Sequence, residues 1–296
     1  MQENKYTAIS YYNFENIKNI FGLRNKIAKV FKKYDVKGIV LLAPEGININ
    51  ISYISEKKGN IIDDLKEVIF LKETSIKIFN CKKHIFRKLK IKIKKEILTT
   101  RNLIEIKPLK KVGTYVRPSE WEEFIKSPDV ILIDTRNDYE VKVGSFKNAV
   151  NPKCQNFTSI LEWIKNYILV KDNKDKKIAL FCTGGIRCEK ASSLIKLSGF
   201  KNVYQLEGGI LNYFKKNTKA TSWKGECFVF DNRVSLKMNL DKGSFDLCYA
   251  CRMPIDELEK RSKNYIKGIS CSNCIGKKTI TQLNKYKTRQ LQKSIG

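Results

Sequence analysis

The segment 178–195 constrains the fold of this chain more than any other. An unbroken apolar run, Ile178–Phe181, leads into Cys182 and the pair Gly184-Gly185, and the residues that follow have helical spacing, with an apolar face of Ala191, Leu194 and Ile195. This pattern predicts a buried strand, a tight loop and an amphipathic helix. Cys182 therefore stands where a buried strand turns into a helix.

The loop after the strand has the composition of an anion-binding turn, and its residues are Cys182, Thr183, Gly184, Gly185, Ile186 and Arg187. Gly184 and Gly185 can adopt positive φ, so that backbone N–H groups point inward as an anion nest. The helix N-terminus adds a partial positive charge and Arg187 a full one. All three favour the thiolate of Cys182, which is the nucleophilic form. We interpret Cys182 as a nucleophile, because a core cysteine needs neither the glycines nor the arginine.

Residues 117–217 read as an α/β domain with a parallel sheet. The apolar runs Val130–Ile133 and Ile178–Phe181 are continuous, as in parallel strands that are buried on both faces. A helix at about 157–169 lies between them, and 202–206 supplies a further strand. Alternating strands and helices imply right-handed crossovers, and active sites in such folds lie beyond the carboxyl ends of the strands. Cys182 falls at that edge.

Residues 1–98 read as an α+β domain, and 99–116 as a linker. Apolar patterning predicts the order β-α-β-β-α-β of a ferredoxin-like split unit. Its first helix, 16–34, has an apolar stripe that consists of Ile17, Ile20, Phe21, Ile27 and Phe31. The last strand of the unit is assigned to 88–94, where apolar residues and lysines alternate.

The lysines of that strand are a candidate RNA-binding surface. Lys88, Lys90, Lys92 and Lys94 share one face of the predicted strand, and the whole chain carries a formal charge of +28. Such an excess suggests a polyanionic partner, nucleic acid before membrane, and a row of lysines suits phosphates. Two alternatives stay open: a solvated outer face, and a lysine-rich composition that an AT-biased genome gives any protein. His84, the only histidine, supports no catalytic role.

The chain is expected to be cytoplasmic. It contains no apolar stretch near the ~18 residues of a membrane span, and its start lacks the layout of a signal peptide. Its nine cysteines are therefore expected to be catalytic, metal-binding or buried rather than disulfide-bonded. Cys188 could resolve an oxidised Cys182 or simply be buried in the first helical turn, and we interpret Cys81, Cys154 and Cys227 as structural.

Residues 218–296 form a C-terminal extension with a zinc-like motif. Two C-x-x-C pairs are separated by nineteen residues, and their cysteines are Cys248, Cys251, Cys271 and Cys274. This spacing is typical of a tetrahedral structural zinc site. Reduced surface thiols, or the remnant of a richer cluster, remain alternatives. The basic stretch 276–296 is either a helix that lies on RNA or a frayed end.

Several motifs of the second domain resemble those of rhodanese domains. They are Asp134-Thr-Arg136, Tyr139-Glu140, Gly144–Ala149, the loop that starts at Cys182, and Leu206–Ile210. The six-residue loop is similar to that of sulfur-handling rhodaneses, whereas related phosphatases use a loop one residue longer. Ser145 departs from the pattern, since most rhodaneses have histidine there.

The resemblance is closer to one subgroup, the bacterial tRNA uridine(34) hydroxylase family. It is carried by the segments 182–192, 9–12, 44–48, 136–140 and 225–231. The resemblance implies an acylphosphatase-like first domain, a rhodanese domain and a Cys-rich tail, although this tail has fewer cysteines than is usual in the family. It also implies oxygen-dependent formation of 5-hydroxyuridine at the wobble position of tRNA. Cys182 matches the family's essential cysteine, described as a persulfide.

The leading functional hypothesis is a tRNA-modifying oxidoreductase that acts on the anticodon loop. It takes molecular oxygen as co-substrate and draws on a sulfur donor protein. One alternative is a rhodanese sulfurtransferase that passes persulfide sulfur to an acceptor; another is an RNA-binding adaptor with a vestigial pocket. No flavin or nicotinamide fingerprint and no His-carboxylate iron triad is visible in the sequence. One chemical hypothesis is that the Cys182 thiolate or its persulfide adds to carbon 6 of uracil.

Overall fold

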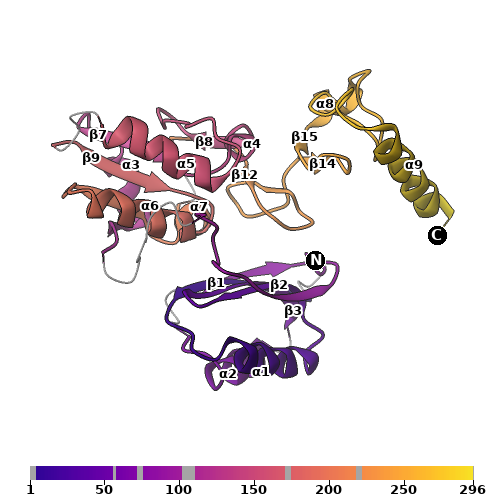
Figure 1. Cartoon of the computed structure of the whole chain (residues 1–296), viewed down its shortest axis with the longest axis horizontal. Helices are drawn as coiled ribbons and strands as arrows, with labels where there is room; N and C mark the ends of the chain where they lie inside the picture. The colour runs from indigo at the N-terminus through magenta and orange to yellow at the C-terminus, as the bar shows by residue number, and fades with distance from the viewer. Residues whose placement is uncertain are drawn as a thin grey trace.

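The structure is a computed structural model that describes residues 5–55, 58–71, 76–101, 111–170, 175–217 and 222–295. Figure 1 shows the first unit below, the second unit above it, and an arm that carries the C-terminal helix to one side. Among the described residues, no helix is both long enough and apolar enough to cross a bilayer.

The first unit is a five-stranded sheet covered by two helices. Its elements are β1 (Tyr6–Phe14), α1 (Ile20–Lys32), β2 (Lys37–Ala43), β3 (Gly46–Ile54), α2 (Lys58–Lys66), β4 (Lys77–Cys81) and β5 (Leu89–Ile93). The strand order is β4-β1-β3-β2-β5. The expected β-α-β-β-α-β order is confirmed by β1 to β4, but the lysine-rich strand is not its last member. It is an added fifth strand, β5, which pairs in parallel with the free edge of β2.

The helices α1 and α2 cover one face of this sheet (Figure 1). Ile9 and Tyr11 of β1 point into that core, which also contains Ile27 and Phe31 of α1. The prediction for Phe21 is wrong, because its side chain is 74% exposed. At the start of α1, Ile17 and Ile20 pack against the core instead, and Phe21 is not part of this core.

The opposite face of the sheet packs against the second unit. Ala8 and Phe79 belong to the same apolar cluster as Trp121 and Phe181 of the second unit. Side chains alternate along a strand, so residues next to Ile9 and Tyr11 necessarily face the other way. Ser10 and Tyr12 therefore share the face of Ala8 and are directed toward the second unit.

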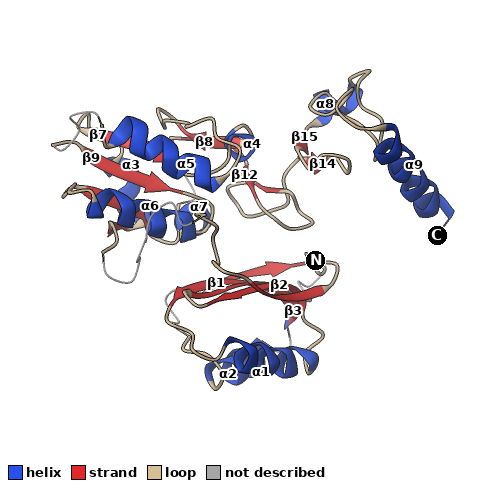
Figure 2. Cartoon of the chain, viewed as in Figure 1, coloured by secondary structure: helices blue, strands red, loops and turns tan. Residues whose placement is uncertain are grey.

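The second unit is an α/β layer fold around a four-stranded parallel sheet (Figure 2). Its strands are β6 (Thr114–Val116), β7 (Val130–Asp134), β9 (Lys177–Phe181) and β10 (Val203–Leu206), in the order β6-β10-β9-β7. Its helices are α3 (Pro118–Phe124), α4 (Asp138–Val141), α5 (Phe157–Trp163), α6 (Ile186–Leu197) and α7 (Gly209–Lys216), and a π-helical turn, Ile164–Ile168, extends α5. The expected parallel sheet is confirmed.

The segment expected to be a linker includes part of this sheet. Strand β6 lies within 99–116 and pairs with β10 from Thr114 to Val116. Those three residues are therefore structural members of the second unit, because their backbone groups complete its edge. Residues 102–110 of the expected linker lie outside the described residues.

The C-terminal extension has two parts. The first contains β11 (Trp223–Gly225), which pairs with β8 (Gly144–Phe146), and the pair β12 (Cys227–Phe228) and β13 (Ser235–Leu236). The second, the cysteine module, contains β14 (Asp246–Leu247), β15 (Pro254–Ile255), α8 (Glu257–Arg261) and α9 (Ile280–Ile295). Helix α9 is docked on this module, since the Arg289 guanidinium donates to the carbonyls of Tyr249 (3.0 Å) and Gly268 (2.9 Å).

Candidate active site

Cys182 is the first residue after β9, and the loop it begins leads into α6. Gly185 is the N-cap residue of α6 and has φ +101°, as expected for an inward-turning loop. Gly184 does not adopt positive φ, so only one of the two glycines behaves as predicted. A Cβ atom at Gly185 would lie 2.7 Å from the Tyr12 hydroxyl, whereas one at Gly184 would meet nothing within 4 Å. Gly185 is therefore required both by its backbone and by the approach of the first unit.

The surroundings of Cys182 stabilise its thiolate. Burial opposes ionisation of the thiol. Three effects outweigh it: the Cys188 thiol donates a hydrogen bond to the sulfur, the Arg187 guanidinium adds its charge, and the Arg187 and Gly185 amides donate to the sulfur. Together they lower the pKa of Cys182 to about 5. The Gly185 N–H lies 3.1 Å from Sγ. Cys182 has no solvent-exposed surface, but it lines a cavity. The arrangement is that of a pre-ionised nucleophile.

Arg187 is held in place by a buried carboxylate on α4. Its two terminal nitrogens donate to the Glu140 oxygens at 2.7 and 2.8 Å, and the Glu140 side chain is fully buried. Burial alone would lower the pKa of Arg187, but Glu140 and the Cys182 thiolate raise it above its ordinary value. Arg187 therefore remains a cation beside the sulfur. Glu140 was seen in the sequence only as part of a motif, with no site role assigned to it.

Cys188 is both buried and in contact with Cys182. It lies in the first turn of α6, with its sulfur 3.6 Å from the Thr135 hydroxyl. Burial, and the neighbouring Cys182 thiolate, raise the pKa of Cys188 well above that of an ordinary thiol. It therefore stays protonated and serves as a hydrogen-bond donor to Cys182.

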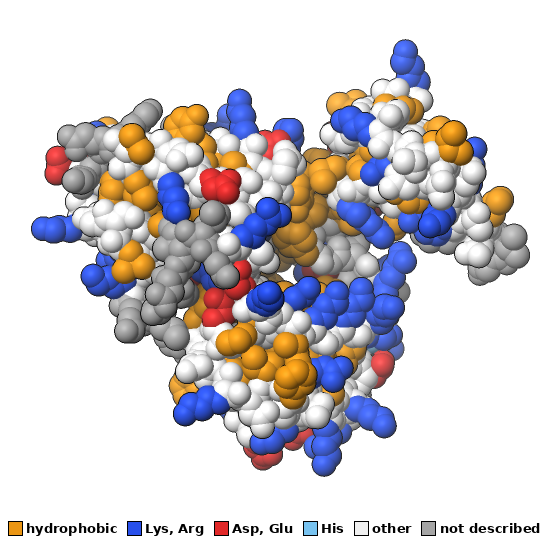
Figure 3. Space-filling view, viewed as in Figure 1, with side chains coloured by type: hydrophobic (Ala, Val, Ile, Leu, Met, Phe, Trp, Pro, Cys, Tyr) orange, Lys and Arg blue, Asp and Glu red, His pale blue; other side chains and the backbone are white. Residues whose placement is uncertain are grey.

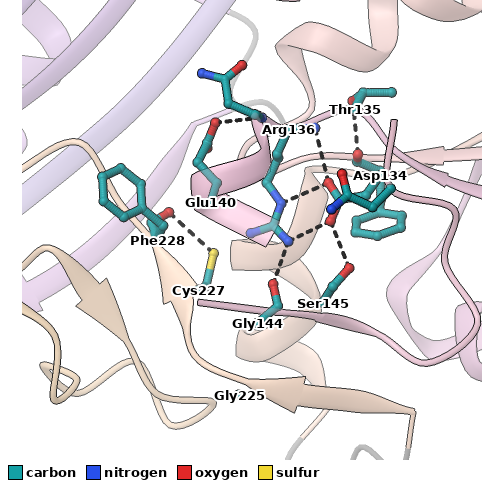
Figure 4. A network of polar contacts seen from close by, with 12 residues as sticks. Asp134, Thr135, Arg136, Glu140, Gly144, Ser145, Gly225, Cys227 and Phe228 are labelled. Atoms are coloured by element: carbon teal, nitrogen blue, oxygen red, sulfur yellow. Dashed lines mark hydrogen bonds and ion pairs between the residues drawn. The ribbon is translucent and has the colours of Figure 1, made fainter. Parts of the chain in front are cut away.

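A buried network at the end of β7 supports this side of the loop (Figure 4). Arg136, which is fully buried, donates to both oxygens of Asp134 at 2.9 and 2.6 Å and to the Gly144 carbonyl at 2.6 Å. The Ser145 hydroxyl donates to Asp134 at 2.8 Å. Ser145, which departs from the usual rhodanese histidine, is thus a second donor to the Asp134 carboxylate.

Residues from the first unit, together with Tyr115 of β6, bind the start of α6. The hydroxyls of Tyr12 and Tyr115 donate to the same oxygen of Glu189, at 3.1 and 2.7 Å. The Lys190 ammonium, only 1% exposed, contacts Glu45 at 2.8 Å and Glu96 at 3.2 Å. In the sequence, the one sign of these contacts is the charged run at the start of an otherwise apolar helix. Tyr12, Glu45 and Glu96 thus connect the first unit directly to the helix that follows the Cys182 loop.

The Cys182 loop and the first unit enclose a cavity of about 580 Å³, which we call the catalytic cavity. Its lining includes Cys182, Thr183 and Arg187 from the second unit, and from the strands of the first unit the side chains of Ser10, Tyr12, Leu41, Asn48 and Asn50. Lys77 lies close by, with its ammonium 5.2 Å from the Tyr12 ring centre. Burial lowers the pKa of Lys77 to about 8, against the opposing charges of Cys182 and Glu189.

The four predicted RNA-binding lysines do not contact the Cys182 loop, but they lie on a related surface. Lys88, Lys90, Lys92 and Lys94 are all exposed. Lys90 and Lys92 pair with Ile39 and Leu41 of β2, which line the catalytic cavity. Paired residues share a face of a sheet, so these lysines continue the cavity-facing surface to the sheet edge.

The ionisation of Cys182 predicts a distinctive pH dependence. The lowered pKa means that the thiolate is present above about pH 5 and is lost only as the pH falls through that value. The difference in ultraviolet thiolate absorbance between the wild type and Cys182→Ser should titrate near pH 5. In Cys188→Ala the midpoint should rise, because one donor to the sulfur is lost. A wild-type midpoint near the ~8.5 of a free thiol would contradict the assignment.

The four cysteines of the C-terminal module form a candidate metal site. The sulfurs of Cys248, Cys251, Cys271 and Cys274 all lie within 4.8 Å of one another. The sulfur–sulfur distances are 3.6 Å for Cys251 and Cys271, 3.8 Å for Cys271 and Cys274, and 3.9 Å for Cys248 and Cys274. A tetrahedral zinc with bonds of about 2.3 Å would separate its sulfurs by about 3.8 Å. The residues therefore fit a metal ion, and three of the four are buried rather than surface thiols.

Comparison with known proteins agrees with this architecture. Residues 6–97 match the family model described as a UPF0176 acylphosphatase like domain, and residues 117–216 match the rhodanese-like domain. The solution structure of a rhodanese-like domain from Anabaena sp. is 15% identical over 38% of this chain and 80% of that one, with a TM-score of 0.32.

Two curated proteins are similar over almost the whole length. A protein of Prochlorococcus marinus (strain MIT 9515) is 41% identical over 99% of this chain and 96% of its own length. One of Teredinibacter turnerae is 42% identical over 98% of this chain and 90% of its own length. Both are named tRNA uridine(34) hydroxylase. With this degree of identity over both complete domains, the chain belongs to the tRNA uridine(34) hydroxylase family.

Proposed function

We propose that this protein hydroxylates carbon 5 of the wobble uridine of tRNA, with Cys182 as the nucleophile. The observation that carries the proposal is a stabilised thiolate inside a cavity that the first unit closes from the other side. The names of the two long relatives supply the substrate. An anticodon loop is unpaired, so its base can be splayed out of the stack and enter such a cavity.

Cys182 would act on carbon 6 of the uracil ring. The thiolate, or a persulfide carried on it, forms a bond to carbon 6 while the electron pair of the C5–C6 double bond moves toward carbon 5 and the O4 carbonyl. Carbon 5 becomes electron-rich and can react with molecular oxygen, the proposed co-substrate. One oxygen atom stays on carbon 5 as the hydroxyl, and the other is reduced to water by two electrons from a thiol reductant. Loss of the carbon 5 proton then expels the sulfur from carbon 6 and restores the C5–C6 double bond. Arg187 and the loop amides keep the sulfur ionised before it adds. If the persulfide is the reacting form, a sulfur donor protein is a further partner.

The same loop would also suit a sulfurtransferase that passes persulfide sulfur to an acceptor. The surface around the catalytic cavity favours the RNA-modifying function, because the cavity-facing side of the first unit continues into Lys90 and Lys92. A small acceptor would need no such basic surface. A tRNA substrate also suits the charge of +28, and we expect the reaction in the cytoplasm, where tRNA is used.

Nucleoside analysis of tRNA from a deletion strain tests this function. Loss of 5-hydroxyuridine, restored by the wild-type chain, is the expected result. Loss of a thiolated nucleoside with 5-hydroxyuridine intact would instead identify the sulfurtransferase. Unchanged tRNA would contradict both.

We also propose that the cysteine module binds one structural zinc ion. The module has a small apolar core that consists of the four cysteines and a few neighbours, among them Ile255 and Tyr265. A core of this size is usually insufficient without a metal, which contributes about 10–16 kcal/mol in zinc-finger peptides.

Zinc removal should therefore unfold the cysteine module but not the parallel sheet. Purified wild-type protein should contain about one zinc per chain, and Cys271→Ser should lose it. Limited proteolysis should then cut within 246–295 first. Cys154→Ser, which changes a half-buried cysteine of the second unit, should keep its zinc. Absence of metal from fully reduced wild-type protein would contradict the proposal.

A further inference from the structure

A second cavity adjoins the catalytic cavity. It has a volume of about 470 Å³, and we call it the flanking cavity. The two cavities share the lining residues Ile39, Phe86, Val229, Phe230 and Asp231. A ligand that fills the catalytic cavity and continues beyond it would therefore pass into the flanking cavity.

An exposed aromatic ring stands between the two cavities. Phe230 lines both of them and is 62% exposed. It packs edge-on against Phe228, with ring centres 5.1 Å apart, and Phe228 packs in turn on Tyr139 at 5.4 Å. The Arg187 guanidinium lies 5.9 Å from the Phe230 ring centre, on the side of the nucleophile. Phe230 is thus positioned by neighbouring rings while much of its surface stays open.

The flanking cavity is also strongly basic. Four exposed cations line it: Arg87, Lys88, Lys90 and Arg252. Among the described residues, none of the four forms an ion pair. Asp231, the one acidic residue among the described residues that line the cavity, is already bound to Arg233 at 2.7 Å. Figure 3 shows a row of lysine and arginine side chains on the first unit beside the hollow between the units.

One of these cations comes from the cysteine module. Arg252 directly follows Cys251, and its N–H donates to the Cys248 carbonyl at 2.7 Å. Its φ of +67° is unusual for an arginine and belongs to the turn that brings the two cysteines together. The fold of the cysteine module therefore determines where the Arg252 side chain lies.

We propose that the flanking cavity is a second nucleotide subsite, which binds the RNA nucleotide next to the target uridine. The base of this nucleotide stacks on Phe230, and its phosphate pairs with Lys88, Lys90 and Arg252. An open aromatic ring beside unpaired cations is the combination that binds single-stranded nucleic acid. The volume is within the range of ligand pockets. This inference rests on the proposed function, and it gives the cysteine module a part in substrate binding.

Binding of a synthetic anticodon stem-loop with uridine at the wobble position tests the subsite. Phe230→Ala should weaken binding about tenfold, as expected when one stacking ring is lost, and Phe230→Trp should restore it. Arg252→Gln should weaken binding and reduce the slope of log affinity against log salt by about 0.7, the value for one phosphate contact. Matched controls on the far face of the first unit are Phe21→Ala and Arg24→Gln, both at exposed positions of α1, which should bind like the wild type.

An abasic hairpin separates stacking from a general loss of structure. Removal of the base on one side of the target uridine should weaken binding to the wild type but have no further effect on Phe230→Ala. If base removal on either side of the uridine weakens binding to Phe230→Ala as much as binding to the wild type, the subsite is overturned while the proposed function stays intact. Failure of the wild type to bind the hairpin at all would overturn the subsite and the tRNA substrate together.

Discussion

Replacement of Cys182 by serine is expected to abolish 5-hydroxyuridine formation, by about 10⁴-fold or more. The loop lowers the pKa of a thiol to about 5, but the pKa of a serine hydroxyl is too high for the same donors to ionise it. A serine oxygen also cannot carry a persulfide. The measurement is nucleoside analysis of tRNA from a deletion strain that expresses Cys182→Ser.

Cys154→Ser is the matched control, because Cys154 is a half-buried cysteine that lies outside the Cys182 loop and whose thiol donates to the Pro152 carbonyl. It should support normal 5-hydroxyuridine levels. The Cys182→Ser protein should still bind the anticodon stem-loop, which shows that only the chemical step is lost. Hydroxylation at a normal level by Cys182→Ser would rule out the nucleophile.

Glu140→Gln is expected to cause the largest loss of stability among single polar changes at the site. It breaks a doubly hydrogen-bonded pair and leaves the Arg187 charge buried without its partner, which costs about 3–5 kcal/mol. For a domain of this size the melting temperature should fall by roughly 10 °C. The pKa of Cys182 should also change, because Glu140 holds the Arg187 guanidinium in place beside the sulfur.

Glu120→Gln provides the comparison, since Glu120 forms an exposed pair with Arg117 at 3.9 Å. Exposed pairs contribute at most about 1 kcal/mol, so this variant should melt close to the wild type. Equal melting temperatures for the two variants would mean that the buried pair contributes no more than a surface one. Thermal denaturation followed by circular dichroism, with thiolate absorbance as the second readout, distinguishes these outcomes.

Much of the fold was predictable because its elements are periodic over short distances. The unbroken apolar run before Cys182 and the helical spacing after it predicted β9 and α6, and the alternation at 47–53 predicted β3. Phe21 and β5 show where this reasoning fails. Periodicity identifies an apolar stripe, but whether each of its members is covered, and which edge a strand joins, depends on elements that are distant in the chain.

The candidate site divides in the same way. The sequence by itself determined the Cys182 loop, because the cysteine, the glycine at positive φ and the arginine lie within six residues of one another. Only the tertiary structure decided which groups hold that loop in place. Glu140 accepts hydrogen bonds from Arg187, and Tyr12 donates to Glu189, which is 177 positions away in the chain. It also decided that Phe230 and Arg252 lie beside the catalytic cavity. Local backbone preferences act between near neighbours, whereas a buried charge is stabilised by whichever group the packed fold brings within hydrogen-bond distance.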